Sequence, residues 1–324
     1  MPLRGNARSC VVVLAACIAF TGCFNSNGIS RTLKIDGSST VYPISAAVAE
    51  EFHAAHPAAR LTVGYSGTGG GMKKFSVGQI DICDASREMN RRESEACAEN
   101  GIKYLELHIA YDGLAVVVNS KNEWCDELTV EQLREIWRPG SAIRKWSDIN
   151  LEWPEKEIVL FGPGTESGTF DFFTHEIVGE EKSCRADYAA SEDDNFLVNG
   201  VQSDRYALSY FGYAYYEANR DRLKLIGIDA GKGAVRPSPK TVRDGTYSPL
   251  SRPLFIYVSK ASLQWPEASE FVRFYVDHAN ALARSVGYFP VTTDQLKGNQ
   301  QRLEKLLTQS TAPNQPGAGS GRGS

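Results

Sequence analysis

The sequence predicts an α/β protein with two lobes, and two observations support this prediction. From Leu33 onward, short runs of β-favouring residues alternate with stretches of helical periodicity, which is the pattern of helices packed against a sheet. About 300 of the 324 residues follow the N-terminal segment described below, whereas a single hydrophobic core stops growing near ~250–300 residues. Two lobes are therefore expected.

The periodicity places the individual elements along the chain. Strands are predicted at 33–35, 61–63, 80–82, 115–118, 159–161 and 252–258. Helices are predicted at 44–55, 72–77, 128–137, 170–178 and 268–283. The last segment, 310–324, consists mainly of Gly, Ser, Pro and other small or polar residues, and is predicted to be a disordered tail.

The N-terminal segment has the features of an export signal. Two arginines precede an apolar run over 10–20, which is shorter than the roughly 20 residues that cross a bilayer. The run ends in Phe20-Thr21-Gly22-Cys23, which resembles the bacterial lipobox that is cut before an acylated cysteine. We expect a lipoprotein signal peptide at 1–22, lipidation of Cys23 and a polar tether at 23–32. Because Phe20 replaces the usual leucine, cleavage without lipidation remains an alternative.

The charge balance argues against two classes of partner. The chain has 35 Lys and Arg against 39 Asp and Glu, and residues 1–22 contain two of the arginines and no acid. A mildly acidic protein gives no support for nucleic-acid binding or for an electrostatic membrane surface.

Beyond the signal and Cys23, the chain has four cysteines, an even number that suggests two disulfides in an exported protein. Four cysteines allow three pairings. We favour Cys83–Cys97 and Cys125–Cys184, because each of these bonds would stay within one proposed lobe.

Three segments share one design, in which a strand leads through a Gly/Ser/Thr turn into a helix. They cover residues 36–43, 65–72 and 162–170. Each offers hydroxyls and free backbone N–H groups at the positive end of a helix dipole, which together can bind an anion. Any single segment could be an ordinary helix cap or tight turn. Three in one chain predict that they converge on one small tetrahedral oxyanion.

Charged residues after the second turn refine this prediction. Arg87 can bind an oxyanion with a bidentate fork. Asp84 could accept the proton of hydrogen phosphate, and its charge would repel sulfate, which carries no proton. The alternatives are a structural turn or cap at Asp84 and a surface ion pair at Arg87.

The sequence predicts no catalytic residue, metal or cofactor. Residues 67–74 lack the Gly-Lys-Ser/Thr ending of a nucleotide-binding loop. Neither 64–67 nor 164–168 has the Gly-x-Ser-x-Gly spacing of a nucleophile elbow. The five histidines are scattered along the chain.

Together these motifs resemble the phosphate-binding subunits of Pst-type ABC importers, which have the type II periplasmic-binding-protein fold. The resemblance runs from about residue 33 to 307 and is carried by the segments 36–40, 66–71, 84–87, 162–169, 191–195, 210–213, 249–254 and 286–288. It implies two lobes, at 33–115 plus 250–309 and at 116–249. A hinge of two crossing strands would join them, and the ligand would lie in the cleft between them.

The resemblance also implies the residues of the site. Hydroxyls and backbone amides of the three turns would hold phosphate, together with the two charged residues; the set is Ser39, Thr40, Val41 (backbone), Ser66, Thr68, Gly69, Gly70, Asp84, Arg87, Ser167, Gly168 and Thr169. The chain departs from the best-known branch of the family at two places. Arg87 stands where that branch has its proton-accepting aspartate, and residues 162–164 replace the region of its arginine. Asp84 is then the candidate proton acceptor.

The expected function is high-affinity capture of inorganic phosphate outside the cytoplasm. A monomer, tethered to the membrane by its lipid anchor, would close about its hinge and deliver phosphate to the permease subunits of an ABC importer, without catalysis. The alternatives are a binding protein for another oxyanion such as sulfate, a secreted phosphatase, and a phosphate sensor.

Overall fold

The computed structural model describes residues 31–165 and 167–311. From Thr32 onward they belong to one compact unit. Two long strands organise this unit, β4 (Tyr104–Asn119) and β12 (Ser251–Ser259). The central path of the main sheet has the strand order β2-β1-β3-β12-β4-β8-β6-β7.

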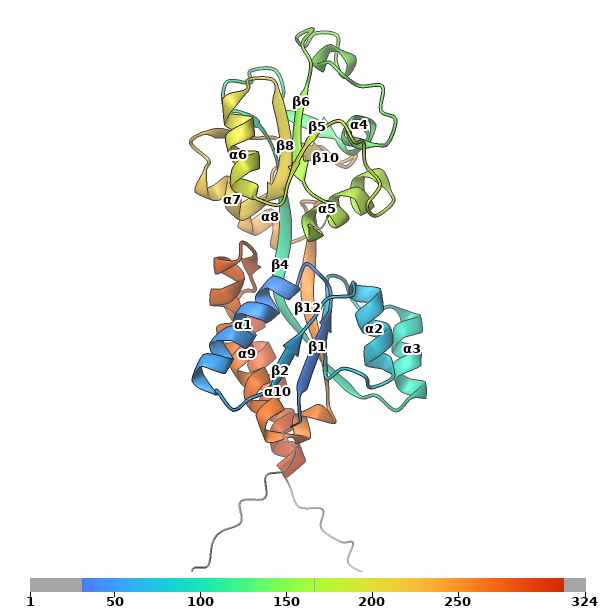
Figure 1. The fold of residues 1–324 in the computed structure, drawn as a ribbon, viewed down its shortest axis with the longest axis vertical. Helices are drawn as coiled ribbons and strands as arrows, with labels where there is room; N and C mark the ends of the chain where they lie inside the picture. Colours follow the sequence, from blue (N-terminus) through green and yellow to red (C-terminus); the bar gives the residue numbers. More distant parts are fainter. Residues whose placement is uncertain (1–30, 166, 312–324) are drawn as a thin grey trace, which may run out of the picture. The chain divides into compact units, whose positions relative to one another are not determined.

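The first lobe is a sheet with helices on both faces. Its strands β1 (Leu33–Gly37), β2 (Leu61–Val63) and β3 (Ile82–Ala85) are parallel, and β12 joins them antiparallel to β3 and β4. One face carries α1 (Tyr42–Ala55), α9 (Pro266–Ser285) and α10 (Thr293–Thr311) (Figure 1). The other face carries α2 (Thr68–Ser76) and α3 (Arg91–Glu99) (Figure 1).

Side-chain periodicity explains this layering. Along α9 the buried residues recur at helical spacing, so one continuous stripe faces the sheet; they are Ala268, Phe271, Val272, Tyr275, Val276, Ala279, Leu282 and Ala283. Along β1, buried Leu33 and Ile35 alternate with exposed Lys34. Phe75 and Met72 of α2 fill the core on the opposite face of the sheet.

The second lobe repeats this architecture. The end of β4 pairs antiparallel with β8 (Ala207–Gly212) and β9 (Leu223–Leu225), and β6 (Val159–Pro163) and β7 (Ala189–Ser191) continue the sheet. Helices α4 (Val130–Trp137) and α5 (Gly168–Phe173) pack on one face, while α6 (Asp194–Ser203) and α7 (Tyr213–Ala218) pack on the other (Figure 1).

Shorter elements complete the fold. A three-stranded sheet consists of β5 (Glu127–Thr129), β10 (Gly227–Asp229) and β11 (Ala234–Val235). A π-helical turn, Thr174–Val178, extends α5, and α8 spans Pro239–Arg243. The remaining pieces are β13 (Phe289–Pro290) and the 3-10 turns Trp146–Asp148 and Ser262–Gln264.

An aromatic cluster forms the centre of the second core. Phe173 stacks on Tyr210 with ring centroids 3.6 Å apart, and Trp137 packs edge-on against both rings. All three side chains are buried. The cluster fixes the end of α5 against β8, and α5 begins at one of the predicted anion-binding turns.

The two lobes share β4, which changes partner in its middle. Residues 104–113 pair with β12, and 114–118 pair with β8. Leu114 marks the change: its backbone N–H donates to Leu250 O at 2.9 Å, and its carbonyl accepts from the buried Tyr247 hydroxyl at 2.8 Å.

Most predicted elements are confirmed, with differences at specific places. Strand β3 begins at Ile82, two residues after the predicted start, because Asp81 turns its carboxylate to the Lys34 amide and the Ser262 hydroxyl. Strand β4 has 16 residues, where only 115–118 were predicted. Helices α3, α6, α7, α8 and α10 were not predicted, nor was the central strand β8 or the short strands β5, β7, β9, β10, β11 and β13. Helix α10 continues to Thr311, past the expected start of the tail.

The structure does not show the predicted disulfides. Cys83, Cys97, Cys125 and Cys184 are all free thiols in the structure. The Cys83 and Cys125 thiols point to nearby carbonyls, those of Asp84 at 3.5 Å and Glu127 at 3.8 Å. Burial raises the pKa of the Cys125 thiol to about 12, so it stays protonated.

The N-terminal predictions concern residues that the structure does not describe. The signal peptide at 1–22, Cys23 and nearly all of the tether lie outside the described residues, as does the tail beyond 311. Within the described part, no helix combines the length and apolarity needed to cross a membrane.

The bond between Tyr247 and Leu114 can be tested by deleting one hydroxyl. Tyr247→Phe should lower the free energy of unfolding by about 1 kcal/mol, because a buried carbonyl loses a hydrogen-bond donor. Tyr215→Phe, at a side chain 37% exposed, is the matched control and should change it little. Urea denaturation measures both, and equal effects would contradict a structural role for the Tyr247 hydroxyl.

Candidate functional site

The first turn, Ser38–Val41, connects β1 to α1. Gly37 before it has φ +143°, and a Cβ there would lie 2.1 Å from Asp84 O, so only glycine fits. This close approach lets Ser38 N donate to Asp84 O at 2.9 Å. Val41 is the N-cap of α1, and no side chain caps its first amides. In the helix itself, Tyr42 N donates to Ser38 O at 3.0 Å and Ile44 N to Val41 O at 2.9 Å, so an anion would meet the backbone N–H groups of the turn, at Ser39 and Val41.

The second turn, Ser66–Gly70, leads from β2 into α2 and lies against the first. Ser66 N donates to Gly37 O at 2.9 Å. A Cβ on Gly71 would lie 2.5 Å from Gly37 Cα, so the start of α2 packs directly on the backbone of the first turn. No side chain caps α2, whose N-cap is Gly67. The structure therefore places two uncapped helix starts next to each other.

The third turn, of which residues 164, 165 and 167–169 are described, leads into α5 in the second lobe. The Ser167 hydroxyl caps this helix by accepting from Thr169 N at 3.2 Å. A Cβ on Gly168 would lie 3.2 Å from both Ser39 Oγ and Thr40 Oγ1. The third turn therefore touches the first, as the convergence of the turns requires.

Arg252, which the sequence analysis did not select, connects these turns. Its guanidinium donates to Thr40 Oγ1 in the first turn and to Asp112 Oδ2 on β4 at 3.2 Å. It also lies 3.7 Å from the ring centroid of Phe172 on α5. The segment 249–254 is one of those that carry the family resemblance, and 252–258 is predicted as a strand. Nothing in the sequence indicated that β12 points this arginine at the first turn.

Burial sets the electrostatics of this pair. The Arg252 and Asp112 side chains are 16% and 4% exposed. Burial raises the pKa of Asp112, and the guanidinium of Arg252 opposes this rise. The pair places a cation beside the first turn without an uncompensated buried charge.

Arg87 lies at the second turn but is bound to an acid. Its guanidinium forms a bidentate ion pair with Glu93 at 2.8 and 2.9 Å, and its side chain is 44% exposed. A Cβ on Gly69 would lie 4.0 Å from its Nη2. The hydrogen bonds that Arg87 donates to Glu93 raise the pKa of Arg87, which remains charged. Arg87 is therefore part of an ion pair at the surface and, at the same time, a cation near the N-terminus of α2.

Asp84 is not brought together with the hydroxyls of the turns. Its side chain is fully buried, and its Oδ1 accepts from Ser45 Oγ at 2.9 Å. Ser45 Oγ in turn lies 2.9 Å from the Tyr275 hydroxyl, in the core beneath α1. Burial raises the pKa of Asp84 well above its usual range, although the Ser45 hydrogen bond opposes the shift. The backbone of Asp84 supports the first turn, while its carboxyl lies on the core side of α1.

The hydroxyls of the second turn make defined contacts. Ser66 Oγ donates to Asp36 Oδ1 at 2.8 Å. Lys74 Nζ donates to Asp36 Oδ2 at 2.6 Å. Thr68 Oγ1 accepts from Ser86 N and lies 3.1 Å from Ser86 Oγ. Side chains near the turn thus hold both hydroxyls in place.

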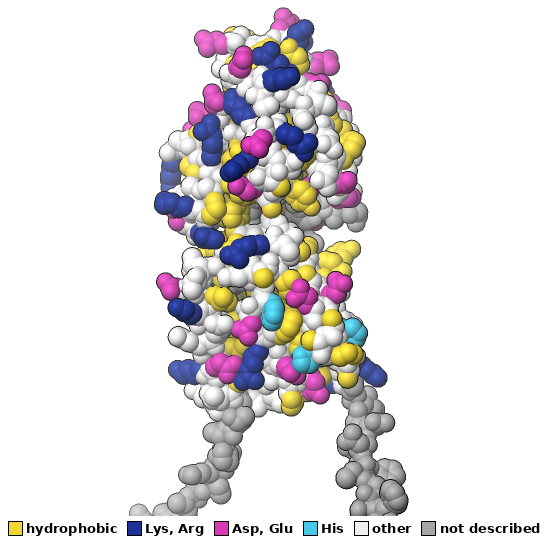
Figure 2. All heavy atoms as spheres, turned by 90° about the vertical axis from the view of Figure 1, so that its left-hand side faces the viewer, with side chains coloured by type: hydrophobic (Ala, Val, Ile, Leu, Met, Phe, Trp, Pro, Cys, Tyr) yellow, Lys and Arg dark blue, Asp and Glu magenta, His cyan; other side chains and the backbone are white. Residues whose placement is uncertain are grey.

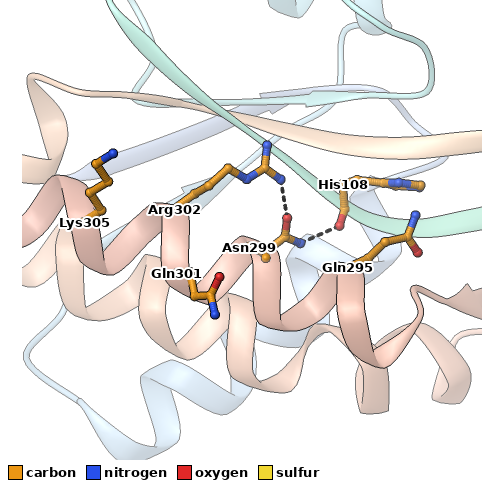
Figure 3. Close-up of a pocket in the computed structure, with 7 residues that line it drawn as sticks. His108, Gln295, Asn299, Gln301, Arg302 and Lys305 are labelled. Atoms are coloured by element: carbon orange, nitrogen blue, oxygen red, sulfur yellow. Dashed lines mark hydrogen bonds between the residues drawn. The ribbon is translucent and has the colours of Figure 1, made fainter.

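A separate pocket of about 500 Å³ lies between β4 and α10 (Figure 3). Asn299 links its polar groups, since its amide donates to His108 O and accepts from Arg302, both at 2.7 Å. None of the predicted site residues lines this pocket. Across the described residues, no group of three or more His, Cys, Asp or Glu could hold a metal ion.

The surface shows no extended field of one charge on the face drawn in Figure 2. Lys and Arg side chains lie among Asp and Glu side chains there. This distribution agrees with the nearly balanced composition. An anion would therefore be attracted by the charges close to the turns and not by an extended positive surface.

Comparison with known proteins places this geometry in a family. The model of the PBP superfamily domain matches residues 25–279, which is most of the chain. The chain belongs to the PBP superfamily. The two α/β sandwiches joined through β4 and β12 are the two-lobed type II fold of this superfamily.

Individual PBP-superfamily relatives extend over nearly the whole chain. The protein SphX of Synechocystis is 48% identical over 265 residues, 81% of this chain and 79% of that protein. The phosphate-binding protein PstS of Staphylococcus aureus is 36% identical and covers 93% and 91% of the two chains. A crystal structure of a possible phosphate-binding protein from Planctomyces limnophilus is 46% identical, with a TM-score of 0.82, over 86% of this chain and all of that one.

The buried ion pair gives a stability prediction. Arg252→Leu should lower the free energy of unfolding by roughly 3–5 kcal/mol at neutral pH, because Asp112 is left buried without its cation. Arg87→Leu removes the ion pair with Glu93, in which the arginine side chain is 44% exposed, and should cost less, about 1 kcal/mol.

The pH dependence identifies the cause of the Arg252→Leu penalty. The folded-state pKa of Asp112 would lie even further above its unfolded value in this variant, so the penalty should shrink as the pH falls and Asp112 is protonated. Urea denaturation of the full chain at several pH values measures this. A penalty independent of pH would contradict the assignment to Asp112.

Proposed function

We propose that this chain binds inorganic phosphate among its three turns and delivers it to the permease of an ABC importer. The observation that supports this most strongly is the meeting of the first and third turns. Gly168 of the second lobe lies against Ser39 and Thr40 of the first lobe, with Arg252 on Thr40. Hydroxyls, uncapped amides and a guanidinium then surround one small region.

The relatives favour phosphate among the oxyanions. The S. aureus relative is named a phosphate-binding protein, and the P. limnophilus structure a possible one. A protein assigned to phosphate ABC transport in Clostridium perfringens, solved with bound phosphate, is 25% identical with a TM-score of 0.54. The role is therefore binding and delivery, and the site needs no catalytic group.

The proposed ligands follow the predicted set, with two changes. Hydroxyls and amides would come from Ser39, Thr40, Val41, Ser66, Thr68, Gly69, Gly70, Ser167, Gly168 and Thr169. Arg252 is added as the main cation, and Arg87 would be a second cation at the start of α2. Asp84 is removed from the set of ligands, because its carboxyl faces Ser45. Its backbone carbonyl would instead support the first turn.

Hinge bending would couple binding to transport. We assign one lobe to 33–115 plus 250–309 and the other to 116–249, with the middle of β4 and the start of β12 as the hinge. Because ligands come from both lobes, phosphate would bind the closed form more tightly than the open form and shift the population toward it. The permease would then recognise the closed form.

Calorimetry tests the proposed ligand. The full chain, freed of phosphate, should bind phosphate and should bind sulfate far more weakly. Gly168→Ala should weaken phosphate binding about tenfold or more, because the methyl group would press on Ser39 and Thr40 at 3.2 Å. Gly298→Ala, where a Cβ meets nothing within 4 Å, is the control and should leave affinity unchanged. Tight sulfate binding without phosphate binding would reject the proposal.

The proposed location is outside the cytoplasm, on a lipid anchor at Cys23. The signal-like residues 1–22 and the lipobox-like Phe20-Thr21-Gly22-Cys23 support this. In a bacterial host fed labelled palmitate, the full chain should incorporate the label and sediment with membranes. Cys23→Ala should lose both properties. Label that persists in Cys23→Ala would place the lipid elsewhere, and an unlabelled wild-type chain would mean cleavage without lipidation.

A further inference from the structure

A site that selects phosphate over sulfate needs one hydrogen-bond acceptor among its donors. At neutral pH phosphate keeps at least one P–OH group, whereas sulfate keeps none. Backbone amides and guanidinium groups can only donate, so they serve both anions equally well. The group that accepts from the P–OH therefore determines the selectivity.

The structure offers one hydroxyl of this kind at the second turn. Ser66 Oγ donates its only proton to Asp36 Oδ1 at 2.8 Å. A Cβ on Gly70 would lie 3.0 Å from Ser66 Oγ, so this oxygen is next to the first turn of α2. Ser66 is exposed, and its own amide is bonded to Gly37 O beside the first turn. Its oxygen keeps a lone pair available to a ligand.

Asp36 holds the proton of the Ser66 hydroxyl in a hydrogen bond. Burial alone would raise the pKa of Asp36, but hydrogen bonds from Lys74 and Ser66 hold it below its usual value. As a carboxylate, Asp36 can only accept. Lys74 Nζ donates to its other oxygen at 2.6 Å, which fixes the carboxylate and balances its charge.

We propose that Ser66, oriented by Asp36, accepts the hydrogen bond of the phosphate P–OH group and so determines selectivity for protonated oxyanions. This inference rests on the proposed phosphate site. The chain of bonds runs from P–OH to Ser66 Oγ, from Ser66 O–H to Asp36 Oδ1, and from Lys74 N–H to Asp36 Oδ2. No proton is transferred along this chain of hydrogen bonds. A sulfate oxygen at the same place would face the Ser66 lone pair and be repelled.

The carboxylates beside the first and second turns do not supply this acceptor. Asp84 is fully buried and directed at Ser45. Both Glu93 oxygens are engaged by Arg87, and one also accepts from Asn90 N. Asp112 is buried against Arg252. Asp36 itself reaches the second turn through Ser66 and Lys74. Asp36 is therefore a positioning residue, and Ser66 is the group that would touch the ligand.

Two substitutions and one control test the inference by calorimetry on the full chain, with phosphate, arsenate and sulfate as ligands. Arsenate keeps a hydroxyl, as phosphate does. In Asp36→Asn the side-chain amide can donate to Ser66, which frees the serine proton for any oxyanion. Phosphate and arsenate affinity should fall roughly tenfold to a hundredfold, while sulfate affinity should hold or rise. Ser66→Ala, at an exposed side chain, should weaken phosphate and arsenate binding and leave sulfate unchanged.

Lys73→Gln is the matched control, because it removes a positive charge from an exposed position of the same helix and leaves the bonds among Ser66, Asp36 and Lys74 in place. It should keep the wild-type ratio of sulfate to phosphate dissociation constants, so it separates the loss of the bond between Asp36 and Ser66 from a general change of charge on α2. An unchanged ratio in both Asp36→Asn and Ser66→Ala would overturn the inference, as would a fall of the ratio in Lys73→Gln equal to that in Asp36→Asn. If wild-type protein binds no phosphate, the proposed function itself fails.

Discussion

The close approach of three backbone segments at Gly37 is the constraint on which the site depends. Asp84 O lies only 2.1 Å from the position that a Cβ of Gly37 would take, and the start of α2 lies against the Gly37 Cα. Because these contacts are between backbones, they hold the first two turns at a separation that side-chain motion cannot change. The cost is an absolute requirement for small residues, since any added carbon would separate β1, β3 and α2.

Arg252 performs the corresponding task between the lobes. It comes from β12, the strand that returns to the first lobe, yet it contacts Thr40 and the α5 ring of Phe172. A buried guanidinium is costly unless it is paired, and Asp112 on the neighbouring β4 supplies the partner. The cation is thus held by the strands about which the lobes would bend, so it can remain in place while the turns move around it.

Much of this architecture could be predicted from sequence, and the exceptions have physical causes. The three turns were visible because Gly, Ser and Thr have local conformational reasons to occur before helices. Most of β4 was missed because Glu106 and His108 interrupt its apolar residues, so only the continuous end was recognised. The pairing of Arg87 with Glu93, the burial of Asp84 and the reach of Arg252 depend on tertiary packing. Short sequence patterns cannot predict these contacts, because the partners lie on different elements or are set by burial.

The shared strand β4 also constrains the order in which the protein can assemble. Strands β1 to β3 are made early, but their sheet is completed by β12, some 170 residues later in the chain as the pairing of Ile82 with Val258 shows. The strands of the second sheet, from the end of β4 to β9, lie in one stretch of the chain that is made before β12, α9 and α10 of the first lobe. Until β12 has been made, the edge of β3 that pairs with it is therefore unpaired and could pair with another chain.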